Sequence, residues 1–325
     1  MTQQPADIPD VVYALVAAPG FARHGICFAA RPAGLFRSDD GGRTWRDLYT
    51  GLNFERPVTT AALAVSPAFE NDGCLFAGVP GGVLRSSDGG QTWHAAGLGT
   101  PPPFVSVLAV SPDFANDGTL FAGTLEDGVF RSADGGSHWA AWNFGLLDLN
   151  VLCMVVSPDF ARDETLFVGV ESGLYRSTTG GRAWREPAAD RHGPQPADFA
   201  PVLSLAISPH YATDGTLWAG SEAHGLFCSR DRGKSWARLG EGSIHGAVNS
   251  IVVASDYPTN PHLLVSLGDR LLVSRDDGLS WQEWPLGVNP EGSIIALAAS
   301  LGLTPGAPLS FVRSIVTSPL SGTSP

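Results

Sequence analysis

Carboxylate side chains gather in short loops that join pairs of apolar, strand-like segments of this sequence. Glu126 and Asp127 lie in one such loop, Glu171 in the next along the chain, and Glu222 in the one after that. Two carboxylates held about 5–10 Å apart can hydrolyse a glycosidic bond, whereas a broader group of carboxylates attracts a cation or a basic peptide. For these carboxylates we expect a simply solvated surface, with an acidic arc that binds a cation or a basic peptide, and a catalytic pair, as the alternatives.

Arginine and histidine side chains occur in loops of the same kind and in longer connecting segments. Histidine changes its charge near neutral pH and often serves as an acid–base catalyst, but isolated loop histidines are more often ordinary surface residues. We therefore name no catalytic residue and treat the whole set as one candidate binding face. Its remaining members are Arg31, Arg56, Arg191, His192, His224 and His245.

An octapeptide of the pattern Ser-x-Asp-x-Gly-x-Thr-Trp recurs six times, at intervals of 45 to 52 residues. Its Asp can accept backbone N–H bonds within a tight turn, its Gly supplies a positive φ, and its Trp can pack between units. In the fourth copy, STTGGRAW (177–184), Thr179 replaces the Asp, so we expect a weaker turn there. The acidic residues recur once per unit and should lie far apart, which makes them structural rather than catalytic. This structural set comprises Asp40, Asp88, Asp134, Asp231, Asp276, Trp45, Trp93, Trp139, Trp184, Trp236 and Trp281.

An arginine precedes the Ser of the octapeptide in four of the six copies, at Arg37, Arg85, Arg131 and Arg176. Cys228 and Val273 occupy this position in the other two copies. We expect the arginines to stack on Trp or to bond turn carbonyls.

Each octapeptide belongs to a larger unit of four short strands. A strand that ends in Ser-Pro, as in SVLAVSP (106–112), is followed by an aromatic residue, an Asp-rich turn and a second strand such as TLFAG (119–123). A third strand leads into the octapeptide, and a fourth begins at its Trp. Four short strands at this spacing are typical of a propeller blade, because a lone four-stranded sheet cannot bury both faces.

The repeat predicts one all-β domain, residues 1–325, folded as a β-propeller of four-stranded antiparallel blades. We expect seven blades, the last incomplete and closed by N-terminal residues 1–10, with six blades plus an extra hairpin as the alternative. The expected blade boundaries are 11–58, 59–104, 105–148, 149–200, 201–247, 248–291 and 292–325.

The octapeptide resembles the Asp-box, or BNR repeat, of sialidases, sortilin-type receptor domains, xyloglucanases and photosystem II assembly factors. The resemblance extends over nearly the whole chain by repetition, and it implies the fold rather than the function. A sialidase would also need an arginine triad and a Tyr–Glu pair. Here Arg31 is followed directly by Pro32, without the intervening residue of the sialidase motif, and only Tyr49 lies outside the repeat positions. These departures from the sialidase pattern disfavour a sialidase.

Bulk composition excludes several other classes of protein. The net charge of −12 disfavours nucleic acid as a partner, because that binding depends on Lys and Arg. The sequence has no apolar run of 18 residues and its first residues lack the features of a signal peptide, so we expect no transmembrane segment and a cytoplasmic location. The four cysteines form no CxxC pair and should be buried free thiols. No metal or cofactor is predicted.

These observations favour a non-enzymatic binding or scaffold propeller that presents one loop face to a protein or peptide. A glycoside hydrolase or carbohydrate-binding propeller of the Asp-box type is the first alternative. An assembly factor for a larger complex is the second.

Overall fold

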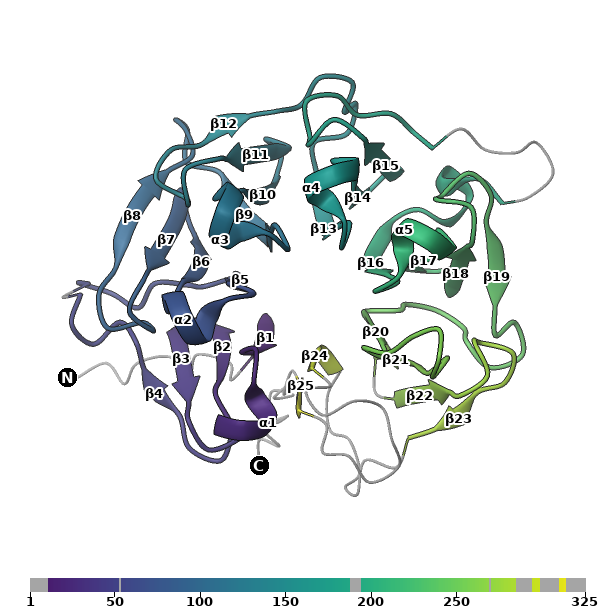
Figure 1. Cartoon of the computed structure of the whole chain (residues 1–325), viewed down its shortest axis with the longest axis horizontal. Helices are drawn as coiled ribbons and strands as arrows, with labels where there is room; N and C mark the ends of the chain where they lie inside the picture. The colour runs from purple at the N-terminus through teal and green to yellow at the C-terminus, as the bar shows by residue number, and fades with distance from the viewer. Residues whose placement is uncertain are drawn as a thin grey trace, which may run out of the picture.

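The computed structural model describes residues 11–52, 54–187, 194–268 and 270–284, together with the backbone of 294–298 and 310–313. Its strands form six antiparallel sheets arranged as blades around a common centre, with one short hairpin in addition (Figure 1). Strand order within each blade follows the chain, so every blade is a simple meander. The fold is therefore an all-β propeller, as the repeat predicts.

The strands occupy four positions from the centre of the ring outwards. The innermost strands are β1 (Ala14–Ala17), β5 (Ala62–Val65), β9 (Phe104–Val110), β13 (Val151–Val156), β16 (Val202–Ile207) and β20 (Ser250–Val253). The second strands are β2 (Cys27–Arg31), β6 (Leu75–Val79), β10 (Leu120–Leu125), β14 (Leu166–Val170), β17 (Leu217–Ser221) and β21 (Leu263–Leu267). The third strands are β3 (Gly34–Ser38), β7 (Gly82–Ser86), β11 (Val129–Ser132), β15 (Gly173–Ser177), β18 (Leu226–Ser229) and β22 (Arg270–Ser274). The outermost strands are β4 (Arg46–Asp47), β8 (His94–Gly97), β12 (Ala140–Ala141), β19 (Ala237–Leu239) and β23 (Gln282–Glu283).

The predicted ring of seven blades is wrong. The described residues form six blades, of which five have four strands and the fourth blade has three, its outer strand being reduced to the single bridge between Arg176 and Arg185. The described residues of the seventh repeat unit form a two-stranded hairpin of β24 (Ile294–Ala298) and β25 (Ser310–Arg313), which packs against β1 and β20 (Figure 1). This unit has no octapeptide to turn the chain into outer strands. Six blades plus an extra hairpin, the alternative, is what the described residues show, and residues 1–10 lie outside them.

A single helical turn links the first and second strands of five blades: α1 (Phe21–His24), α2 (Phe69–Asp72), α3 (Phe114–Asp117), α4 (Phe160–Asp163) and α5 (Tyr211–Asp214). In α2, the Ser66 hydroxyl donates to Asp72 Oδ2 at 2.6 Å, and the Cys74 N–H donates to Asp72 Oδ1 at 2.8 Å. The Ser of each Ser-Pro pair and the Asp six residues later thus close the turn. In α1, His24 replaces this Asp, and its Nδ1 accepts the Ile26 N–H at 3.0 Å.

One aromatic residue in each of α2 to α5, and Tyr257 in the sixth blade, packs against the preceding blade. Phe69 lies edge-on to Phe28, with ring centroids 5.5 Å apart, and the same arrangement recurs at every contact between consecutive blades from the first to the sixth. We call each such contact a seam. The other four pairs are Phe76–Phe114, Phe121–Phe160, Phe167–Tyr211 and Trp218–Tyr257. The hydrophobic core is therefore distributed over the seams between blades rather than gathered at one centre.

Blades approach closely near the centre, and the second strands contain glycine there. A Cβ added at Gly123 would lie 2.6 Å from Cγ1 of both Val107 and Val151, which belong to its own blade and the next. Any side chain at this position would push the two inner strands apart. The Gly of the repeated TLFAG segment is thus explained by packing between blades.

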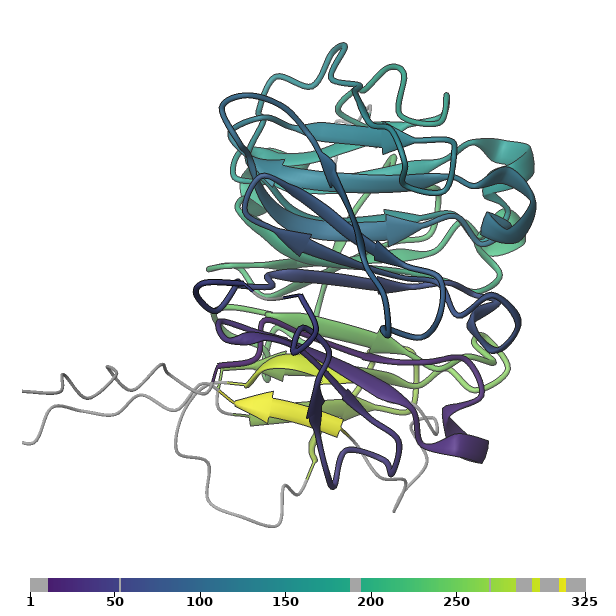
Figure 2. The same cartoon turned by 90° about the vertical axis from the view of Figure 1, so that its left-hand side faces the viewer.

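The ring has two faces that differ in their loops. The five helical turns lie on one face of the disc, at the right in Figure 2, and the octapeptide turns are bonded to them through contacts such as Gly89 N–H to Gly73 O at 3.0 Å. We call this the Asp-box face. The opposite side, the connector face, carries the turns between second and third strands and the segments that join consecutive blades.

Candidate functional site

The octapeptide turns satisfy their own polar groups. In the first copy, Asp40 Oδ1 accepts the N–H groups of Arg43 at 3.0 Å and Thr44 at 2.9 Å, and Oδ2 accepts the Thr44 hydroxyl at 2.7 Å. The Thr44 backbone and side-chain bonds, with that from the Ser38 hydroxyl, hold the pKa of Asp40 well below its usual range. With its oxygens engaged in this way, the carboxylate serves as a turn clamp and not as a base for chemistry.

The remaining turns repeat this pattern with one exception. Asp88, Asp134, Asp231 and Asp276 accept the corresponding N–H and side-chain donors within their own turns. In the fourth turn, Thr179 Oγ1 accepts a single backbone bond, from the Ala183 N–H at 3.1 Å. With Thr in place of Asp, this turn lacks the carboxylate that accepts several hydrogen bonds in each of the other turns.

The repeated tryptophans fall into two groups. The indoles of Trp45, Trp139, Trp236 and Trp281 donate to a glycine carbonyl of their own turn. Trp93 and Trp184 instead donate across a seam, to Leu48 O at 3.2 Å and Trp142 O at 2.7 Å. All but Trp45 pack at the seam with the preceding blade.

The repeated arginines connect consecutive blades on the Asp-box face. Arg37 Nη1 donates to Gly89 O of the next octapeptide turn at 2.8 Å, and its guanidinium carbon lies 5.8 Å from the centroid of the Phe28 ring. Equivalent bonds to the next turn run from Arg85 to the Ser137 hydroxyl, from Arg131 to Gly180 O and from Arg176 to Arg232 O. These arginines are therefore structural latches of the ring.

The cysteines lie apart from one another and are unreactive. The four cysteines are free, and burial raises the pKa of the Cys153 and Cys228 thiols to about 12, which suppresses their reactivity. Among the described residues, no three His, Cys, Asp or Glu side chains are placed to hold a metal ion together. In the same part of the chain, no helix is long and apolar enough to cross a membrane.

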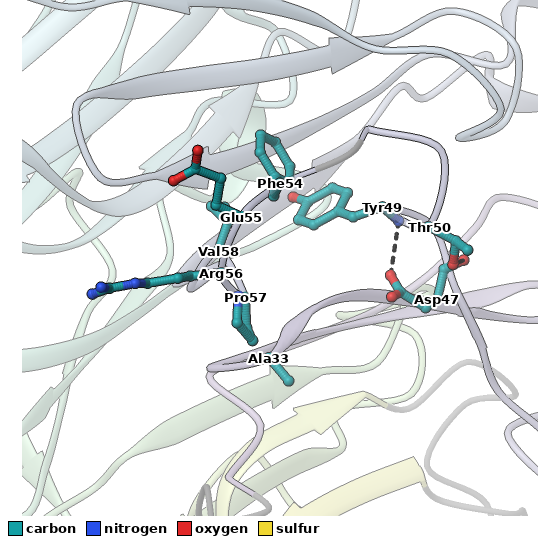
Figure 3. Close-up of a pocket in the computed structure, with 9 residues that line it drawn as sticks. All are labelled: Ala33, Asp47, Tyr49, Thr50, Phe54, Glu55, Arg56, Pro57 and Val58. Atoms are coloured by element: carbon teal, nitrogen blue, oxygen red, sulfur yellow. Dashed lines mark hydrogen bonds between the residues drawn. The ribbon is translucent and has the colours of Figure 1, made fainter. Parts of the chain in front are cut away.

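The segment between the first and second blades forms a pocket of about 400 Å³ on the connector face (Figure 3). It is lined by Ala33, Asp47, Tyr49, Thr50, Phe54, Glu55, Arg56, Pro57 and Val58. Tyr49 forms the buried wall: its N–H donates to Asp47 Oδ1 at 2.7 Å and its hydroxyl lies 2.9 Å from that of Thr60. The Phe54 ring stands edge-on to Tyr49, with centroids 5.8 Å apart, and remains 44% exposed. The pocket therefore combines an aromatic wall with an exposed cation, Arg56.

Two of the predicted acidic loops come together through an asparagine. Asn150 Oδ1 accepts the Glu126 N–H at 3.1 Å, and its Nδ2 donates to the Glu171 carboxylate at 3.4 Å. Asp148 supports the same arrangement, because it accepts the N–H groups of Asn150 and Ser172. The turns that carry Glu126 in the third blade and Glu171 in the fourth are thus tied together, and we call them the acidic edge of the connector face.

Of the other predicted site residues that the structure describes, Asp127 lies in the same turn as Glu126 and the rest lie in other blades. Glu222 and His224 are exposed in the β17–β18 turn, and a bridge between His224 and Gly246 brings this turn beside the loop of His245. Arg31 lies over the rings of Phe36 and Trp45, at 5.2 and 6.0 Å from their centroids. Arg191 and His192 lie outside the described residues, and Asp127 contributes its carbonyl, which accepts the Asn143 amide at 2.8 Å.

Sequence reasoning missed the residues that organise these loops. Asn143, Asp148 and Asn150 all precede the inner strand of the fourth blade, and their concentration in one connecting segment was the available signal. The long segment 186–201 also proves structural in part, since Phe199 in the 3₁₀ turn η1 (Pro196–Phe199) is fully buried and stacks on Phe227 at 4.2 Å. No period in the sequence marks that aromatic residue.

A ring of meander blades, each turned by a Ser–Asp-clamped octapeptide or its Thr179 variant, defines the class of Asp-box β-propellers. The family model of the BNR/Asp-box repeat matches residues 84–95, which span the second octapeptide. The chain is thus a β-propeller that carries the BNR/Asp-box repeat. Curated protein sequences contain no significant match to it.

Solved structures with the same architecture are similar to nearly the whole chain. The extracellular domain of BT4673 from B. thetaiotaomicron matches with a TM-score of 0.67 at 17% identity, over 95% of this chain and 38% of that one. The GH74 xyloglucanase from Xanthomonas campestris matches at 0.65 and 20% identity, over 96% and 52%. YCF48 bound to D1 peptide matches at 0.60 and 16% identity, over 89% and 85%. The chain thus spans about two fifths and one half of the first two proteins, and these likenesses establish the fold alone.

Proposed function

We propose that this chain is a non-enzymatic binding propeller that presents its connector face to a protein or peptide partner. The observation that carries the proposal is the pocket beside Tyr49, in which Phe54 and Arg56 are exposed on a segment held by buried hydrogen bonds. An exposed aromatic ring beside a cation is typical of protein-binding surfaces, where Tyr, Phe and Arg are enriched.

Further exposed aromatic side chains support the choice of this face. Phe104 opens β9, where it pairs with Leu125 at the end of β10, and is 42% exposed. Tyr13 bonds through its N–H to Ala30 O, near the β2–β3 turn, and is 45% exposed. Both therefore lie on the connector face with Phe54, so this side of the ring displays exposed aromatic rings from the first blade, from the segment that follows it and from the third blade.

The comparison with YCF48 bound to a peptide favours the same class of partner, because this chain spans most of that protein's length. An assembly factor for a larger complex is a narrower form of the same proposal. The identity of the captured partner would distinguish an assembly factor from a general binding protein. A cytoplasmic location remains a prediction, supported by the four free thiols.

A glycoside hydrolase is the second candidate, and the observation that favours it is the joining of the Glu126 and Glu171 loops by Asn150. The likeness to the xyloglucanase adds carbohydrate as a possible ligand class, but the chain spans about half of that enzyme. Chromogenic glycosides screened with wild type and Glu171→Gln test this candidate. Turnover that the substitution abolishes would support hydrolysis, whereas wild-type turnover in the variant would remove Glu171 from the mechanism.

Affinity purification from the native host tests the binding proposal. Wild type is compared with Phe54→Ser/Arg56→Glu on the connector face and with Leu279→Ser on the Asp-box face, where Leu279 is 85% exposed. We expect the first variant to lose the co-purifying protein and the second to retain it. Equal recovery with all three proteins, or loss only with Leu279→Ser, would contradict the proposal.

A further inference from the structure

We infer that the loop between the third and fourth blades, residues 142–150, is a docking surface for a basic amphipathic segment of a partner protein. The inference rests on the proposed binding function and names the chemistry of the partner. It starts from two apolar side chains of this loop, Phe144 and Leu147, which are 80% and 84% exposed.

The loop that displays these side chains is fixed on both sides. Asn143 accepts the Val129 N–H at 2.8 Å and donates to Asp127 O at 2.8 Å, which ties the loop to the third blade. The Phe144 carbonyl accepts the Trp184 N–H at 2.8 Å, which ties it to the fourth. Close packing adds to this, since a Cβ on Gly145 would lie 2.3 Å from Trp184 O.

A loop held in this way displays Phe144 and Leu147 without a large entropy cost on binding. Exposed apolar side chains on an otherwise bonded loop stabilise nothing within the described blades, because burial is what makes such groups favourable. Leu146, between them in sequence, is by contrast buried in the seam. The loop therefore places Leu146 in the core and leaves Phe144 and Leu147 exposed to solvent.

The charge around the loop specifies the partner. Glu126, Asp127 and Glu171 lie on the adjoining turns, and residues 125–129, 142–150 and 170–173 contain no Arg or Lys. The guanidinium groups of Arg131 and Arg182, from the octapeptide side of the blades, lie over the Trp142 ring at 4.5 and 5.8 Å from its centroid. An apolar pair beside carboxylates is complementary to a segment with apolar residues on one face and Lys or Arg beside them.

An amphipathic helix satisfies both requirements. Its apolar side chains recur at spacings of three and four residues and can cover Phe144 and Leu147 together. Its flanking cations then face the carboxylates of Glu126 and Glu171. Because carboxylates repel phosphate, the same surface disfavours nucleic acid.

A model peptide provides the test. The probe is a fluorescein-labelled helical peptide with two Leu-Lys-Lys-Leu-Leu-Lys-Leu heptads, and its control has Glu at every Lys position. Binding to the full chain is measured by fluorescence anisotropy at low and moderate salt. We expect the Lys peptide to bind, the Glu peptide to bind at least tenfold more weakly, and affinity to fall with salt.

Matched variants separate this loop from general charge attraction. Phe144→Ser/Leu147→Ser is expected to weaken binding of the Lys peptide at least tenfold, whereas Leu279→Ser, an equally exposed leucine on the Asp-box face, leaves it unchanged. Glu126→Gln/Glu171→Gln, which keeps the side-chain shapes, should weaken binding and reduce its salt dependence. Each variant is compared at a temperature where its unfolding transition shows it to be folded.

Failure of this inference differs from failure of the proposed function. Three results would overturn the inference that this loop is a docking surface. They are no binding of the Lys peptide, equal affinity of wild type and Phe144→Ser/Leu147→Ser, and an equal loss of affinity with Leu279→Ser. The binding function would still stand if the Phe54→Ser/Arg56→Glu variant lost its partner from the native host.

Discussion

Arg230 Nη2 lies 2.6 Å from Asp277 Oδ2 across the seam between the fifth and sixth blades. The Tyr257 hydroxyl completes a triad, since Arg230 donates to it at 3.2 Å and it donates to Asp277 Oδ1 at 3.1 Å. At this seam Cys228 occupies the position of the latch arginines. The ion pair therefore takes over the role that an arginine–turn bond performs at the preceding seams.

Substitutions at Asp277 test this replacement latch. Asp277 has a φ of 64°, a left-handed conformation that glycine adopts at the same place in four other octapeptide turns. Asp277→Ala loses the half-exposed ion pair and keeps the backbone strain, so we expect a loss of about 1–2 kcal/mol in the free energy of unfolding. Asp277→Gly loses the same pair but relieves the strain and should cost less. Urea denaturation measures both, and a larger loss for Gly than for Ala would contradict the explanation.

Restoring the missing acceptor should strengthen the fourth octapeptide turn. Thr179→Asp supplies oxygens for the N–H groups of Arg182 and Ala183, as Asp40 does for Arg43 and Thr44. We expect a gain of about 0.5–1.5 kcal/mol, visible as a higher urea midpoint. Thr179→Ala removes the one remaining side-chain acceptor and should lower the midpoint; a gain with Ala would refute the role of this side chain.

The clamped carboxylates predict loss of stability in acid. Hydrogen bonds hold the pKa values of Asp40 and Asp134 well below the value of about 3.9 expected in the unfolded chain. A lowered folded-state pKa contributes stability that is present above the unfolded value and is lost as pH falls towards the folded value. We therefore expect the urea concentration at the unfolding midpoint to decrease as the pH is lowered below about 4. The double variant Asp40→Asn/Asp134→Asn should show a weaker dependence of this midpoint on pH. An unchanged slope in the double variant would count against the clamps.

The close approach of inner strands predicts a steric cost at Gly123. Gly123→Ala places a methyl group 2.6 Å from Val107 and Val151 and should destabilise the fold by about 1–3 kcal/mol. Gly97→Ala is the matched control, because nothing lies within 4 Å of a Cβ there and its φ is not positive. Thermal unfolding of the two variants makes the comparison, and equal transitions would show that the seam can open without cost.

The repeat made the blades predictable, whereas the end of the ring was not. Six octapeptides and their flanking strands specify six local meanders, because each turn satisfies its own hydrogen bonds within eight residues. The seventh unit retains the inner-strand pattern after residue 292 but not the turn, so strand counting alone overestimated the blades. A complete blade also needs its third and fourth strands, and the sequence pattern of the inner strand does not predict whether they form.

The candidate site was predictable only as a face. Alternation of the strands placed Glu126, Glu171 and Glu222 on the same side of the ring, but the pairing of the first two depends on Asn150, which no motif marks. Similarly, Arg56 was recognised as a loop cation, whereas the pocket beside it requires the buried bond between Tyr49 and Thr60. Contacts between non-repeated loops come from tertiary packing and are invisible to periodicity.

Hydrogen exchange of the complex with its co-purified partner tests the central claim most directly. The account predicts added protection of backbone amides in the connector face, within residues 47–58, 98–104 and 142–150. The octapeptide turns on the Asp-box face should exchange as they do in the free chain. Protection confined to those turns, with the connector face unchanged, would contradict the claim that this propeller binds through its connector face.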